Sequence, residues 1–202
     1  MIVIEGVVGV GKSSLMRHLE KKGYVAFEEP VVDNPILPKF YADRKRYSFP
    51  LQIFFLNKRF KHIKMASSID NSVLDRSIYG DAIFAKMLAK GKDMEEEEYL
   101  IYEELLENML EHVAAPKLMV YLEVSVDEAI RRIRKRGFDY EQGTEREYWV
   151  TLNEEYREFF DSYSISPLLK INVDQLDFQE KPEDLDYILK LIEDKLLEVE
   201  NA

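Results

Sequence analysis

The chain has 202 residues, a net charge of −11 and no cysteine. This composition excludes disulfide and thiolate chemistry, and it argues against a nucleic-acid polymer as partner, because a phosphate backbone binds basic surfaces. No apolar stretch is long enough to cross a membrane, so we expect a cytoplasmic protein without membrane contact.

Short apolar runs and amphipathic stretches alternate along the chain, with no linker-like segment between them. The apolar runs predict buried strands at residues 1–5, 24–28, 72–75, 117–124 and 168–173. The amphipathic stretches predict helices at about 12–22, 43–66, 79–90, 94–113, 126–136, 145–163 and 181–199. This alternation predicts a single α/β domain over residues 1–202, with a five-stranded parallel sheet between two layers of helices. Ligands of such folds bind at the carboxyl ends of the strands.

The first predicted strand ends in GVVGVGKS, residues 6–13, which fits the phosphate-binding pattern G-x-x-x-x-G-K-[ST]. Glycines let the backbone amides of this loop turn toward phosphate oxygens, and the following helix adds the N–H groups of its first turn. The sequence therefore predicts a bound nucleoside triphosphate with Mg²⁺. The histidines of the chain form no metal-ligand cluster, so we expect the metal to arrive with the nucleotide. The nucleotide-binding residues expected here are Gly6, Gly9, Gly11, Lys12, Ser13 and Ser14, with Ser13 also binding Mg²⁺.

Other segments must distinguish the classes of protein that share this loop. A GTPase is expected to carry N-K-x-D, but NKRF at residues 57–60 lacks the aspartate and falls in a predicted helix. A small-molecule kinase needs a carboxylate beside the acceptor hydroxyl and cations around the transferring phosphoryl group. Glu28 and Glu29, followed by Pro30, end the second predicted strand, and one of them is expected to face the site. Periodicity alone does not choose between the two.

Several motifs spread over nearly the whole chain resemble the deoxynucleoside kinase family. They are EP at residues 29–30, YADRKRYSFPLQ at 41–52, DRSIYGD at 75–81 and RRIRKR at 131–136. The resemblance implies the three-layer fold of P-loop kinases, with a short arginine-rich lid at about 131–143. It also implies that Glu29 is the catalytic base, and that Arg76 holds both this glutamate and the 5′-hydroxyl of the acceptor.

The same resemblance implies how the acceptor is bound. Tyr41 is expected at the deoxyribose and Gln52 at the base, where Arg59 and Asp81 form the pair that reads the heterocycle. Glu147, in the segment EQGTEREY at 141–148, is expected to bind the 3′-hydroxyl together with Tyr41. Since Tyr41 would pack against C2′, we expect deoxyribose to be preferred over ribose.

The resemblance also assigns residues to the phosphates. Lys12 and the lid residues Arg132 and Arg136 are expected to neutralise the donor, and Asp75 is expected near Mg²⁺. Members of the family usually carry a further arginine where this chain has Phe138, so one expected cation is absent.

Taken together, the resemblance implies transfer of the γ-phosphoryl group of ATP to the 5′-hydroxyl of a deoxynucleoside, by an enzyme that is a homodimer. The sequences of these motifs are most similar to those of the bacterial deoxyadenosine and deoxyguanosine kinases. Deoxyadenosine is the favoured acceptor, with deoxyguanosine and deoxycytidine as alternatives. Two other classes stay open: a thymidylate-type nucleoside monophosphate kinase, and a regulator that uses the phosphate-binding loop as a switch.

Overall fold

A computed structural model describes residues 1–31 and 34–201. Five strands form one sheet in the order β2-β3-β1-β4-β5, and every neighbouring pair is parallel. The predicted five-stranded parallel sheet is therefore confirmed. The strands are β1 (Ile2–Glu5), β2 (Val25–Phe27), β3 (Ser72–Asp75), β4 (Leu118–Glu123) and β5 (Leu168–Asn172).

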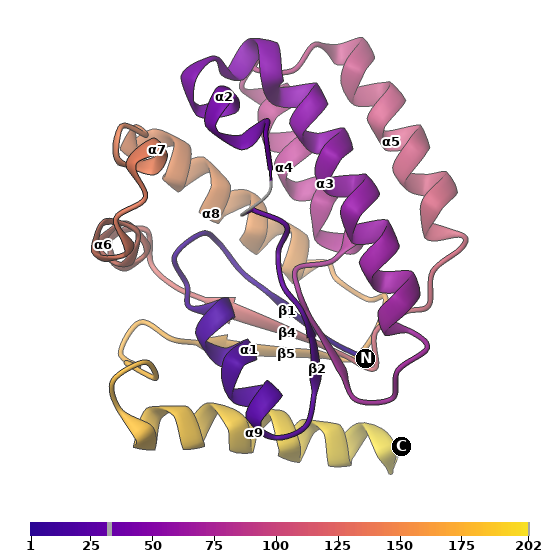
Figure 1. The fold of residues 1–202 in the computed structure, drawn as a ribbon, viewed down its shortest axis with the longest axis vertical. Helices are drawn as coiled ribbons and strands as arrows, with labels where there is room; N and C mark the ends of the chain where they lie inside the picture. Colours follow the sequence, from indigo (N-terminus) through magenta and orange to yellow (C-terminus); the bar gives the residue numbers. More distant parts are fainter. Residues whose placement is uncertain (32–33, 202) are drawn as a thin grey trace.

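Helices cover both faces of the sheet (Figure 1). On one face lie α1 (Lys12–Lys21) and α9 (Pro182–Glu200). On the other lie α3 (Arg44–Ala66), α4 (Ile78–Lys90) and α8 (Arg146–Asp161), with α5 (Glu96–Leu110) packed against α3 and α4. The fold has the three layers that the alternating pattern predicts.

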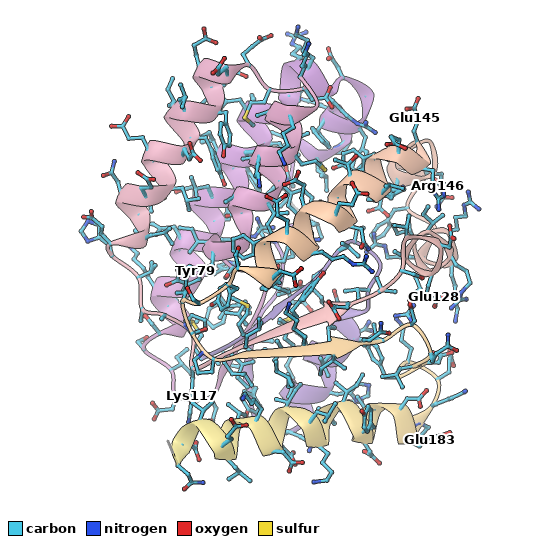
Figure 2. All side chains as sticks on the ribbon, turned by 180° about the vertical axis from the view of Figure 1, so that it is seen from behind. Tyr79, Lys117, Glu128, Glu145, Arg146 and Glu183 are labelled. Carbon is cyan, nitrogen blue, oxygen red and sulfur yellow. The ribbon has the colours of Figure 1, made fainter. Side chains whose placement is uncertain are left out.

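The lid helix α6 (Val126–Arg136) lies beyond the carboxyl ends of the strands. Figure 2 shows it there with the start of α8: Glu128 of α6 and Glu145 and Arg146 lie at the end of the molecule toward which the arrows of β4 and β5 point. The phosphate-binding loop ends β1 at this same edge, so the fold brings the lid and the loop together.

Two short helices were not predicted: α2 (Leu37–Ala42) and α7 (Asp139–Gln142). Both have two turns or fewer, too short for a periodic apolar pattern to develop. The start of α2 is fixed by Asn34, whose side-chain oxygen accepts hydrogen bonds from the amides of Ile36 at 2.9 Å and Leu37 at 3.1 Å. Both helices contribute residues to the cleft described below.

The central strands β1, β3 and β4 are almost wholly buried, as expected for parallel strands covered on both faces. Aromatic rings attach α8 to β4, where Tyr121 stacks on Phe160 with ring centroids 4.2 Å apart. This packing fixes α8, whose first turn carries Tyr148 into the wall of the cleft. Within the described residues, none of the helices combines the length and apolar character needed to cross a bilayer.

Candidate active site

The loop after β1 has the backbone geometry of a phosphate cradle. Gly6, Gly9 and Gly11 have φ values of 149°, 84° and 111°, a region that favours glycine. At Gly9 a side chain is also excluded by space, because a Cβ would lie 2.9 Å from the carbonyl oxygen of Ala129 in α6. The lid helix therefore packs directly on the loop.

Lys12 lies over this loop, buried, with its Nζ donating to the carbonyl oxygens of Gly6 at 3.1 Å and Val7 at 3.2 Å. Burial, and then the charge of Arg76, lower the pKa of Lys12 to about 8. The hydroxyl of Ser13 donates to Asp75 Oδ2 at 3.1 Å, which ties the loop to the end of β3. A phosphate would give the Lys12 ammonium a stronger partner than these carbonyls.

A cleft of about 610 Å³ opens at the carboxyl ends of the strands, where parallel sheets bind ligands. Two walls meet there: the phosphate-binding loop with the lid on one side, and helices α2 and α3 on the other. Most of the residues predicted for the site line it: Gly9, Gly11, Lys12, Ser13, Ser14, Glu29, Tyr41, Gln52, Arg59, Asp75, Arg76, Arg132 and Arg136.

Of the two glutamates after β2, Glu29 is held in place by cations. Its Oε1 accepts hydrogen bonds from Arg59 Nη2 at 2.6 Å and from Arg76 Nη1. Burial raises the pKa of Glu29, but the charges of Arg76, Arg59 and Lys12 outweigh this effect and lower it to about 2. Glu28 is exposed at the rim of the cleft.

Arg76 stands at the junction of the two halves of the site. Besides Glu29, its guanidinium contacts the carbonyl oxygen of Gly6 at 3.3 Å and lies over the ring of Phe84 at 4.9 Å. Its backbone has a φ of 62°, in the left-handed region that non-glycine residues seldom adopt. A strained backbone at this point indicates a functional constraint.

Arg59 and Asp81 form the predicted ion pair, and both side chains are buried. Arg59 lines the cleft, whereas Asp81 is fully buried and is not among the described residues that line it. Arg59 also binds Glu29, a contact that the sequence did not indicate. One guanidinium therefore connects the two carboxylates.

The position of Glu147 differs from the prediction. Glu147 is exposed and is not one of the described residues that line the cleft. Glu141, only 6% exposed, lines it instead, and both of its oxygens lie 2.6 Å from Arg136 Nη2. The reason is α7, which turns Glu141 inward, whereas Glu147 lies on the outer side of the first turn of α8. The signal was present in the same EQGTEREY segment, at its first residue rather than its seventh.

The two lid arginines are held differently. Arg132 donates to the carbonyl oxygens of Val10 at 2.9 Å, Val173 at 2.7 Å and Leu176 at 3.1 Å, and also to Glu128. Arg136 is more exposed and stacks over the ring of Phe138 at 4.6 Å. Arg132 is thus a brace between the phosphate-binding loop and the loop after β5.

The loop after β5 belongs to the site although no sequence motif marks it. Its residues 176–179 line the cleft, and Phe178 lies against the phosphate-binding loop, where a Cβ on Gly11 would be 2.5 Å from its ring. The only available signal was its position after the last predicted strand, at the ligand-binding edge of the sheet.

Comparison with known proteins identifies this architecture. The sequence model of the family described as "Deoxynucleoside kinase" matches residues 2–198. The chain belongs to the deoxynucleoside kinase family. A deoxyguanosine kinase of Lactobacillus acidophilus is 44% identical, over 98% of this chain and 92% of its own length. A deoxyadenosine kinase of the same organism is 42% identical, over 100% of this chain and 98% of its own.

A solved structure supports the same assignment for this kinase. Deoxyadenosine kinase from M. mycoides, with the products dCMP and dCDP bound, matches the fold with a TM-score of 0.86 at 33% identity, covering 96% of this chain and 98% of that one. The predicted P-loop kinase fold and the deoxynucleoside kinase function are therefore confirmed. These matches assign the chain to the deoxynucleoside kinases rather than to the thymidylate-type kinases or the nucleotide-dependent regulators.

Proposed function

We propose that this kinase uses ATP and Mg²⁺ to phosphorylate the 5′-hydroxyl of a deoxynucleoside, with deoxyadenosine preferred. One observation carries the proposal: Glu29 lies in the same cleft as Lys12 of the phosphate-binding loop, held there by Arg76 and Arg59. A carboxylate in this place orients an acceptor hydroxyl and repels an acceptor phosphate, which favours a nucleoside over a nucleotide as acceptor.

Glu29 is the proposed base. Both guanidinium groups bind its Oε1, and no donor from the described residues binds its Oε2. This second oxygen is available to accept the proton of the 5′-hydroxyl. With a pKa of about 2 the carboxylate is ionised at neutral pH but is a weak base. The ionised carboxylate orients the hydroxyl and takes its proton late in the transfer, in keeping with a loose transition state.

The phosphates of ATP are proposed to bind the loop amides, Lys12 and the lid residues Arg132 and Arg136. Ser13 and Asp75 fit a magnesium ion, because Mg²⁺ takes one or two protein oxygens and completes its shell with water and phosphate. In support, Asp75 Oδ1 is buried and makes no hydrogen bond with the described residues. Bound there, Mg²⁺ would neutralise charge that develops on the transferring group.

The donor nucleoside is proposed to lie along the loop after β5. Residues 176–179 of this loop line the cleft on the lid side. Phe178 provides an aromatic surface beside Gly11, and Arg132 holds the loop against the phosphate-binding loop.

The acceptor is proposed to bind between α2, α3 and the lid. Tyr41 and Glu141 would hold the 3′-hydroxyl, with Glu141 in the role that the sequence assigned to Glu147. Gln52, Arg59 and, through Arg59, Asp81 would read the base. Gln52 supplies a donor and an acceptor together, and the charged pair orients a planar heterocycle.

The order of base preference follows from this charged pair, which suits a base with an exocyclic amine or a purine N7. Deoxyguanosine and deoxycytidine are the alternatives, since the relatives described above include a deoxyguanosine kinase and a structure with bound dCMP. Phosphorylation rates for the four deoxynucleosides at matched concentrations, with ATP and Mg²⁺, test the proposal. We expect deoxyadenosine to be fastest and thymidine slowest. A preference for thymidine, or for dAMP over deoxyadenosine, would contradict it.

We further propose a cytoplasmic homodimer. Leu100 and Ile101 on the outer side of α5 are 56% and 58% exposed, an apolar pair suited to contact with a second copy. Light scattering in dilute solution measures the molecular mass directly, and a monomeric mass would contradict this part of the proposal.

A further inference from the structure

Glu5 is a buried carboxylate to which the proposed chemistry gives no task. It is the last residue of β1, directly before the phosphate-binding loop. Its side chain is fully buried, and it is not one of the described residues that line the cleft. Since burying an ionisable group costs free energy, its contacts need an explanation.

The carboxylate of Glu5 lies at the N-terminus of α4. Its Oε1 accepts a hydrogen bond from the amide of Ser77 at 3.0 Å, and Ser77 is the N-cap of that helix. The hydroxyl of Tyr156 lies 3.5 Å from Oε2. A helix N-terminus favours a negative charge, which offsets part of the burial cost.

The first turn of α4 fits closely around this carboxylate. A Cβ added at Gly80 would lie 2.4 Å from Glu5 Oε1 and 2.8 Å from its Cδ. Gly80 does not have a positive φ, so the space for a side chain at this position is limited by the Glu5 carboxylate, which a Cβ would displace, rather than by the backbone conformation. The carboxylate of Glu5 occupies the space that a side chain at position 80 would fill.

The strand before the phosphate-binding loop holds the backbone on both sides of the strained Arg76. The amide of Arg76 donates to the carbonyl oxygen of Ile4 at 2.9 Å, and the next amide, of Ser77, donates to Glu5. A left-handed arginine persists only where its surroundings determine its conformation. These two hydrogen bonds supply that constraint.

We infer that Glu5 is a positioning residue, which sets the strained turn at Arg76 and the start of α4 relative to the phosphate-binding loop. The guanidinium of Arg76 thereby meets Glu29 and the Gly6 carbonyl, and the first turn of α4 presents Asp81 to Arg59. The inference rests on the proposed function for the roles of Arg76 and Asp81.

Two substitutions at position 5 distinguish the effect of the hydrogen bond from Ser77 from the effect of side-chain size. Glu5→Gln keeps an oxygen that accepts from Ser77, whereas Glu5→Met keeps the length and loses the acceptor. We expect Glu5→Met to lower kcat by roughly 10- to 100-fold, the scale of a small misplacement remote from the chemistry, with little change in the Kd of ATP. Glu5→Gln should restore most of kcat. The control is Glu155→Gln, a buried carboxylate of α8 that binds Lys90 of α4 away from the cleft, and it should keep wild-type kcat.

If Glu5→Met does not fold, a second variant tests the same contact. Gly80→Ala places a methyl group against the carboxylate, and it should lower kcat in the same way. Wild-type kcat in folded Glu5→Met or Gly80→Ala would overturn the inference, as would a loss of ATP affinity as large as the loss of kcat. Hydrogen exchange at the Ser77 amide measures the hydrogen bond to Glu5 independently of catalysis. We expect this exchange to be faster in Glu5→Met than in wild type or Glu5→Gln. An inactive wild-type enzyme would instead contradict the proposed function.

Discussion

Arg59 is shared by two carboxylates with different tasks. Its guanidinium binds Glu29 at 2.6 Å and pairs with the buried Asp81. The guanidinium proposed to read the nucleobase therefore also lies against Glu29, the proposed catalytic base. A ligand that draws Arg59 toward Asp81 would weaken its hold on Glu29, so recognition and chemistry are coupled through one side chain.

Glu29→Gln tests the proposed base. The amide keeps the size of the side chain but cannot take a proton, so we expect turnover to fall by roughly 10²–10⁴, the usual scale of acid–base assistance. Nucleoside binding, measured by calorimetry, should persist. The matched control is Glu28→Gln at the exposed neighbouring position, with a change in kcat of about twofold or less. Unchanged turnover in Glu29→Gln would reject this residue as the base.

Arg59→Met tests the electrostatic link through the pH dependence of kcat/KM, which reports ionisations of the free enzyme. In wild type the pKa of Glu29 is about 2, so Glu29 causes no loss of activity between pH 8 and pH 5. Removing the charge of Arg59 raises this pKa, because burial then faces one fewer opposing cation. We therefore expect an acid limb to move upward into the measurable range.

Lys58→Met provides the control for Arg59→Met, since it removes a charge from an exposed neighbour on the same helix. It should leave the acid side of the pH profile as flat as in wild type. A flat profile in Arg59→Met as well would mean that Arg59 does not control the ionisation of Glu29.

The lid helix α6 carries two adjacent arginines, Arg131 and Arg132. Substituting each in turn distinguishes the effect of the hydrogen bonds that join two loops from the effect of positive charge alone. Arg131 and Arg132 both bind Glu128, but only Arg132 also donates to the loop after β1 and the loop after β5. We expect Arg132→Ala to weaken ATP binding by about 10- to 100-fold, from the loss of several charged hydrogen bonds. Arg131→Ala should change it by about threefold or less, as exposed ion pairs contribute little. Calorimetric titration with ATP measures both, and equal losses would show that charge alone matters.

The element-scale predictions succeeded where the pattern was long and failed where it was short. All of the long helices were predicted, with ends displaced by a few residues, because each extends over ten residues or more. The helix α7 has only four residues. Without α7 there is no reason in the sequence to expect Glu141 in the cleft, since the direction of its side chain depends on that short helix. Side chains at the ends of predicted strands, such as Asp75 and Glu29, could be assigned to the cleft because strand ends meet at one edge.

At the scale of the molecule, the alternation of strands and helices was enough to predict a parallel sheet with two helical layers. It could not predict that Arg59 bridges Glu29 and Asp81, or that Glu5 lies beneath α4. These contacts join residues 30 and 72 positions apart in the chain and depend on how helices dock on the finished sheet. Their roles, like those of the other site residues, stay predictions.

Acid stability is a property of the whole chain, in which 39 acidic residues face 28 lysines and arginines. Burial raises the pKa of Glu29, but nearby positive charges, mainly that of Arg76, together outweigh this effect and lower it to about 2. The pKa of Glu128 is also lowered to about 2, mainly by its hydrogen bond with Arg131. Such groups stabilise the fold above their ordinary pKa of 4.5, and that stability is lost as the pH falls toward 2. We therefore expect Tm to fall steeply below about pH 4.5.

Comparing wild type with Glu29→Gln isolates one contribution to this acid limb. At pH 7 the variant leaves Arg76 and Arg59 buried without their shared carboxylate, so it should be less stable, by an amount on the order of a few kcal/mol. As the pH falls from 5 toward 2, the unfolded wild-type chain protonates Glu29 while the folded protein keeps it ionised down to its pKa of about 2, so this stabilisation is progressively lost, whereas the variant has no group to titrate at position 29. The two Tm curves, measured by circular dichroism at constant ionic strength, should converge in this range. Curves that stay parallel would mean that the fold does not depend on the charge of Glu29.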